Sequence, residues 1–138
     1  MGPVHELMIL GCGPAGMTAA IYAARKRIDI VMISEDAGGQ VATTFGIENY
    51  PGFQYITGPE LVDKFRSQMG QFDIEQYLGE KITRLSRQDG LFVAQTASGK
   101  EHAARTCIIA TGARPRQLGV TGENKYRGKG VSYCATCD

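Results

Sequence analysis

The stretch LMILGCGPAG, residues 7–16, decides the fold of this chain. Its first four residues are apolar and predict a short buried strand, after which Gly11, Gly13 and Gly16 follow with G-x-G-x-x-G spacing. The first glycine permits a tight turn, the second lets backbone approach a pyrophosphate, and the third lets a helix pack closely on the strand. Pro14 suits the first helical position, where no N–H donor is needed. The stretch therefore predicts a strand–turn–helix unit that binds a dinucleotide.

The residues after this turn continue the same pattern. An alanine-rich helix is expected over residues 14–27 and a strand over residues 28–34. Glu35 follows that strand, 19 residues beyond Gly16, where a carboxylate that binds a ribose hydroxyl is expected. Asp36 is a competing candidate for the same role.

The remaining chain predicts one more helix and several short strands. The helix, residues 58–72, has apolar residues at helical spacing, which we expect in the core. A further strand of the main sheet is expected at residues 74–78. A three-stranded meander is expected at residues 81–87, 91–96 and 101–104, and a separate returning strand at residues 107–110. The predicted fold is α/β: a Rossmann-like domain whose parallel sheet is flanked by helices and carries an inserted β-meander.

Composition excludes several classes of protein. The chain has 138 residues, 43% of them hydrophobic, and a net charge of +1, which favours one compact domain and gives no basic surface for nucleic acid or membrane. No apolar run has the length of a signal peptide or a membrane span. We therefore expect a soluble cytoplasmic protein.

The four cysteines fall into two kinds. Cys12 and Cys107 lie in apolar surroundings and are expected to be buried thiols. Cys134 and Cys137 form a C-x-x-C motif, in which a lowered thiol pKa supports disulfide exchange. Asp138 is placed to move a proton to or from a leaving thiolate. Too few ligands accompany the pair for zinc, so we expect no metal.

Five motifs resemble those of low-molecular-weight thioredoxin reductases, in the same order along the chain. They are GCGPAG (11–16), GGQ (38–40), ENYPG (48–52), ATGA (110–113) and CATCD (134–138). The resemblance covers the whole chain and implies an FAD-binding domain in an enzyme that passes electrons from NADPH through flavin to a C-x-x-C disulfide and on to thioredoxin. Homodimers are expected from the same resemblance.

The resemblance also implies roles for individual residues. The glycine turn is expected to hold the FAD pyrophosphate through Gly11, Gly13, Pro14, Ala15 and Gly16, and Glu35 is expected to hold the ribose. Along the flavin, the expected residues are Gly39, Gln40 and Asn49. Behind the cofactor, they are Thr111 and Gly112. The resemblance further implies that Cys137 faces the flavin, that Cys134 exchanges with thioredoxin, and that Asp138 is the proton donor.

Length is the main departure from this family. Residues 1–113 correspond to the FAD-binding domain, and residues 114–138 to a linker and the start of the NADPH domain. The rest of the NADPH domain and a C-terminal FAD segment are not in this sequence, so we expect the N-terminal half of a reductase, inactive by itself. A flavoprotein partner of a peroxide-reducing system and a non-catalytic FAD-binding module remain alternatives, and NADPH is one of several possible donors.

Overall fold

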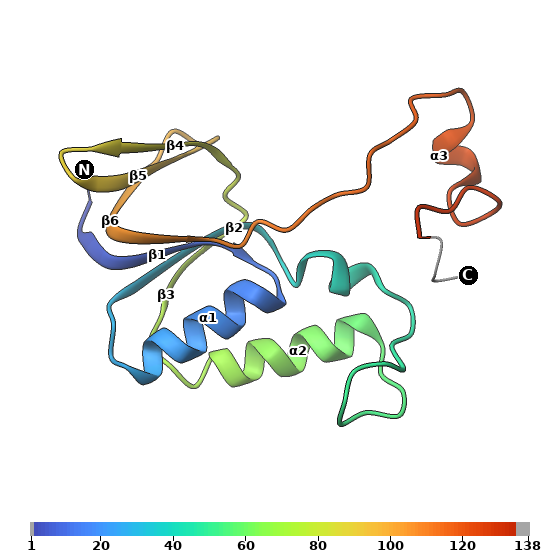
Figure 1. The fold of residues 1–138 in the computed structure, drawn as a ribbon, viewed down its shortest axis with the longest axis horizontal. Helices are drawn as coiled ribbons and strands as arrows, with labels where there is room; N and C mark the ends of the chain where they lie inside the picture. The colour runs from blue at the N-terminus through green and yellow to red at the C-terminus, as the bar shows by residue number, and fades with distance from the viewer. Residues whose placement is uncertain (1, 135–138) are drawn as a thin grey trace.

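A computed structural model describes residues 2–134 (Figure 1). The elements, in chain order, are β1 (Val4–Cys12), α1 (Pro14–Arg25), β2 (Ile30–Ala37), the short 3₁₀ helix η1 (Gly39–Thr43), α2 (Gly58–Met69), β3 (Glu75–Leu78), β4 (Ile82–Gln88), β5 (Leu91–Thr96), β6 (Glu101–Ile109) and α3 (Glu123–Tyr126).

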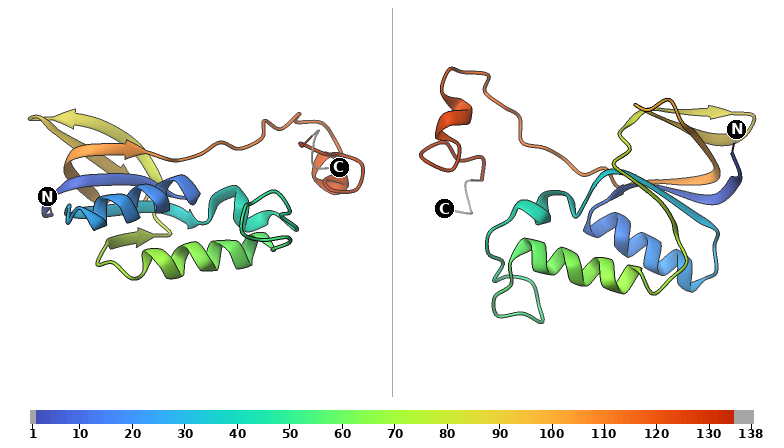
Figure 2. Two further views of the ribbon diagram at one scale, coloured as in Figure 1. Left: turned by 60° about the horizontal axis from the view of Figure 1, so that its bottom comes forward. Right: turned by 180° about the vertical axis from the view of Figure 1, so that it is seen from behind.

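The strands form one six-stranded sheet in the order β3-β2-β1-β6-β5-β4. β1 pairs in parallel with both β2 and β6, and β2 pairs in parallel with β3, whereas β4, β5 and β6 pair antiparallel as a meander. Helices α1 and α2 lie on the same face of the sheet (Figures 1 and 2). This is the fold class that the sequence predicts, an α/β sheet with an inserted meander.

Strand β1 is buried on both faces, as a central parallel strand should be. Leu7 and Ile9 pack with α1 and α2, whereas Met8 and Leu10 pack on the opposite face with residues of β2, β5 and β6. Successive side chains of a strand point to opposite faces, so one apolar run fills both halves of the core. The glycine turn that follows β1 is therefore held on a rigid element.

The prediction of a separate returning strand is wrong. Residues 101–104 and 107–109 belong to one strand, β6, because its first half pairs with β5 and β1 together and its second half with β1 alone; residue 110 follows the strand. Arg105 and Thr106 lie beyond the last residue of β6 that pairs with β5, and their exposed polar side chains do not interrupt the strand. Likewise α1 ends at Arg25 rather than at residue 27, because Arg27 has a φ of 60°.

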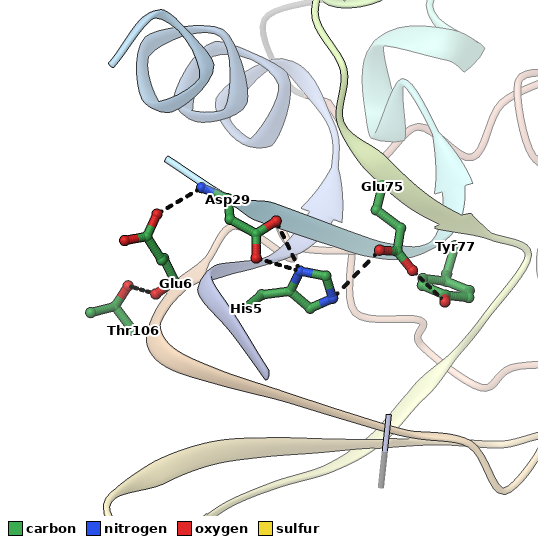
Figure 3. A network of polar contacts seen from close by, with 6 residues as sticks. All are labelled: His5, Glu6, Asp29, Glu75, Tyr77 and Thr106. Atoms are coloured by element: carbon green, nitrogen blue, oxygen red, sulfur yellow. Dashed lines mark hydrogen bonds and ion pairs between the residues drawn. The ribbon is translucent and has the colours of Figure 1, made fainter. Parts of the chain in front are cut away.

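A polar network joins three elements at the edge of the sheet opposite the glycine turn (Figure 3). His5, which is 5% exposed, lies with Nδ1 3.1 Å from Asp29 Oδ2 and with Nε2 3.5 Å from Glu75 Oε2. The Tyr77 hydroxyl donates to the other oxygen of Glu75 at 2.6 Å. This imidazole therefore ties β1 to the turn before β2 and to the edge strand β3.

Replacing His5 with alanine is expected to lower the free energy of unfolding by about 1–3 kcal/mol, because a buried side chain and two polar contacts are lost together. Urea denaturation measures this change. Val4→Ala is the matched control, since Val4 lies on the same strand but is 44% exposed. Equal effects of the two substitutions would contradict the structural role of the network.

Candidate functional site

The glycine turn lies where the carboxyl ends of β1, β2 and β6 meet. The Cys12 N–H donates to Ser34 Oγ at 3.0 Å, and the Gly38 N–H donates to the Cys12 carbonyl at 2.7 Å. On the other side, the Ala110 N–H donates to the Leu10 carbonyl at 2.8 Å. The turn is thus fixed by hydrogen bonds to both neighbouring strands.

The three glycines of the motif have different physical reasons for lacking a side chain. Gly11 has a φ of 106°, and a Cβ there would lie 2.3 Å from the Ala110 carbonyl oxygen. A Cβ on Gly16 would lie 2.0 Å from the Gly11 carbonyl oxygen, which confirms that this glycine lets the helix pack closely. A Cβ on Gly13 would meet no protein atom within 4 Å. Gly13 therefore leaves space that the protein itself does not use.

That space belongs to a cavity of about 730 Å³ at the N-terminus of α1. The first turn of α1 has no side-chain cap, so its free N–H groups and the positive end of the helix dipole are available to an anion. Eight of the predicted cofactor-binding residues line the cavity: Gly11, Gly13, Pro14, Ala15, Gly39, Gln40, Thr111 and Gly112. Residues from three distant parts of the chain thus converge on one anion-accepting site.

Three predicted cofactor residues lie outside this cavity. Gly16 is buried where α1 packs on the turn. Glu35 lines a neighbouring cavity of about 360 Å³, which shares Gly11 and Thr111 with the first. Asn49 is exposed in the loop between η1 and α2 and lines neither cavity. Contact of Asn49 with the flavin stays a prediction.

An arginine that sequence reasoning missed stands at the acidic end of the site. Arg114 Nη2 lies 3.4 Å from Glu35 Oε2 and 3.8 Å from Asp36 Oδ2, and all three side chains are well exposed. Asp36 and Arg114 line both cavities, whereas Glu35 lines only the smaller one. The two candidate ribose acids therefore share one cation. The sequence signal that could have identified Arg114 is its position directly after the ATGA motif (110–113) that follows β6.

The two thiols of the domain are poorly suited to redox chemistry. Cys12 is 1% exposed, and burial raises the pKa of its thiol. Cys107 is only half-buried, less than the sequence predicts, and burial raises its pKa as well. Because the thiolate is the reactive form, these shifts disfavour reaction of both groups.

Cys134 lies in a cavity of about 620 Å³ that adjoins the main one. The two cavities share five residues, which form the boundary between them: Gln40, Thr43, Pro115, Arg127 and Tyr133. The structure thus brings the first cysteine of the motif next to the end of the site that contains Gln40. Cys137 and Asp138 lie outside the described residues.

Within residues 2–134, no group of three His, Cys, Asp or Glu side chains gathers closely enough to hold a metal ion. None of the helices described there has the length and apolar character needed to cross a membrane.

The fold and the site together define a dinucleotide-binding α/β protein: a parallel sheet, a glycine turn over an open cavity, and a helix N-terminus directed at it. Residues 5–138 match the sequence model of a family described as pyridine nucleotide-disulphide oxidoreductase. The chain belongs to this family.

Its relatives carry a more specific name. The chain is 46% identical over 136 residues to the thioredoxin reductase of Listeria innocua and 42% identical to that of Bacillus subtilis, with 98% of this chain and 42% of each relative covered. It superposes on the thioredoxin reductase of Streptococcus pyogenes with a TM-score of 0.83 and 43% identity, covering 96% of this chain and 43% of that one. These comparisons confirm the resemblance found in the motifs. The chain spans about two fifths of the length of the curated relatives it matches.

Proposed function

We propose that this chain is the FAD-binding part of a thioredoxin reductase, with residues 1–113 forming that domain and residues 114–138 leading into an NADPH-binding domain. The observation that carries the proposal is the cavity over Gly13, because the uncapped N-terminus of α1 opens into it and it adjoins the cavity of Cys134. The relatives named thioredoxin reductase over the same residues support it.

The residues of the turn would hold the cofactor by its charged centre. The backbone N–H of Ala15 and the first turn of α1 would bind the FAD pyrophosphate, with Gly13 giving access to it. Glu35 or Asp36 would accept hydrogen bonds from the ribose hydroxyls, and the Arg114 guanidinium would hold that carboxylate in place. Bound FAD supplies the two-electron chemistry that protein side chains lack.

The dithiol would carry the electrons out of the protein. We propose that the Cys134 thiolate attacks the disulfide of thioredoxin, forming a mixed disulfide and releasing one thioredoxin thiolate. Cys137 would then displace the second thioredoxin sulfur, so one disulfide is reduced as the C-x-x-C disulfide forms, and Asp138 would supply a proton to a leaving thiolate. NADPH is the proposed donor, the cytoplasm the proposed location, and a homodimer the proposed assembly.

The proposal is tested in the complete protein that carries this chain. Cys134→Ser is expected to lower NADPH-dependent reduction of thioredoxin by about a thousandfold or more, because the exchanging sulfur is lost. FAD should stay bound, as its absorbance band reports. Cys107→Ser is the control, since that thiol lies outside both cavities. Full activity of Cys134→Ser, or no thioredoxin reduction by the wild type, would contradict the proposal.

A further inference from the structure

The segment between β6 and the redox motif is organised by one buried charge. Among residues 111–134, Glu123 alone is fully buried, although it carries a carboxylate and its neighbours are mostly exposed. The segment lies apart from the two large helices and contains one helix, α3, of a single turn (Figures 1 and 2). A segment without an apolar core needs polar contacts to hold one conformation.

Three donors converge on the Glu123 carboxylate. The Leu118 N–H donates to Oε1 at 2.8 Å and the Gly119 N–H donates to Oε2 at 2.7 Å. The Tyr133 hydroxyl also donates to Oε1. These hydrogen bonds lower the pKa of Glu123, so the carboxylate stays charged, and the same contact raises the pKa of Tyr133, so the hydroxyl keeps its proton.

Tyr133 lies on the boundary between the two cavities. It directly precedes Cys134 in the sequence, and it lines both the large cavity and the cavity that contains Cys134. The Arg127 guanidinium lies 5.2 Å from the centre of the Tyr133 ring and lines both cavities as well. A contact that holds the Tyr133 ring in place therefore also holds the backbone directly before Cys134.

We propose that Glu123 and Tyr133 are positioning residues for the redox motif, because their hydrogen bond holds the chain directly before Cys134 beside the cofactor cavity. The inference rests on the proposed function, in which that cysteine exchanges electrons. Cys134 is disulfide-bonded in this structure, so the observed hydrogen bond belongs to the oxidised form. Removing the bond should then weaken the disulfide relative to the dithiol.

The test is a titration of the complete protein that carries this chain with glutathione. Each disulfide formed in the C-x-x-C motif consumes one glutathione disulfide and releases two glutathione thiols, so the equilibrium constant follows directly. Tyr133→Phe, which removes only the hydroxyl, is expected to lower that constant about tenfold, a rise of about 30 mV in reduction potential. Tyr126→Phe is the matched control, because Tyr126 lies on α3 and is half exposed.

A second variant separates positioning from general loss of structure. Glu123→Gln should shift the potential in the same direction, and the double variant Glu123→Gln/Tyr133→Phe should shift it no further than the larger single effect, because both remove one interaction. Equal potentials for wild type, Tyr126→Phe and Tyr133→Phe would overturn the inference. A complete wild-type protein that forms no C-x-x-C disulfide at any glutathione ratio would contradict the proposed function itself.

Discussion

Replacing Gly13 with valine is expected to weaken FAD binding at least about a hundredfold while the domain keeps its fold. Gly13 has a φ of −83° and a ψ of −177°, which any residue adopts, and a Cβ there would touch no protein atom within 4 Å. The added methyl groups would instead fill the cavity where the pyrophosphate is proposed to lie against the first turn of α1. The substitution therefore acts on the ligand and leaves the apoprotein almost unchanged.

Flavin absorbance titration gives the dissociation constant, and urea denaturation gives the stability. Because valine is a poorer residue than glycine at a helix N-cap, a loss of up to about 1 kcal/mol in stability is expected. Thr18→Val is the control, since Thr18 lies on the exposed face of the same helix and outside the cavity. Unchanged FAD affinity in Gly13→Val would show that the phosphates bind elsewhere.

Replacing Gly16 with alanine, three residues further on, is expected to act mainly on the stability of the fold rather than directly on the ligand. The new Cβ would lie 2.0 Å from the Gly11 carbonyl oxygen, a backbone atom that side-chain motion cannot relieve. Either α1 or the turn must move, so we expect the free energy of unfolding to fall by about 3 kcal/mol or more. The gain in helix propensity from glycine to alanine offsets only about 1 kcal/mol of this loss.

Gly13→Ala is the matched control for this experiment, because both variants add one methyl group within the same motif. Urea denaturation of the two apoproteins should separate them clearly, with Gly16→Ala the less stable. If both variants unfold at the same urea concentration, the close packing of α1 on the turn does not limit stability. Gly13 and Gly16 would then be equivalent in their effect on stability.

The sequence predicted the parts of the fold that depend on local pattern. The glycine turn and the opening of α1 at Pro14 follow from a motif whose geometry is short-range, whereas the placing of Gln40 and Thr111 beside the cofactor was implied by the family resemblance. Parallel strands bring their carboxyl ends to one edge of a sheet, so residues that follow strands meet there. Eight of the eleven cofactor residues that the glycine motif and the resemblance predicted line a single cavity.

Features that depend on long-range pairing could not be predicted. The continuity of β6 rests on its pairing with β1, which no local pattern reveals, and Arg105 and Thr106 looked like a break. Gly58 appeared only as the start of a helix, yet a Cβ there would lie 1.9 Å from the Val41 carbonyl oxygen. The close packing of α2 on η1 is therefore a tertiary constraint hidden in an ordinary helix start.

Charged residues gave the least reliable guidance. Glu123 read as an ordinary polar residue in a linker, but it is 5% exposed and organises the chain before the redox motif. Arg114 was one of several basic residues near the chain's end, and only the structure pairs it with Glu35 and Asp36. The environment of such a group depends on which segments fold against it, and the sequence does not state this.

We propose that the first turn of α1 binds the phosphates of FAD. An amide NMR titration of the 138-residue chain with FAD tests this placement, because it detects weak as well as tight binding. We expect saturable shifts of the Gly13 and Ala15 amide signals, with smaller shifts at Thr111 and Gly112. FAD binding that leaves the Gly13 and Ala15 signals unmoved would contradict this placement of the phosphates.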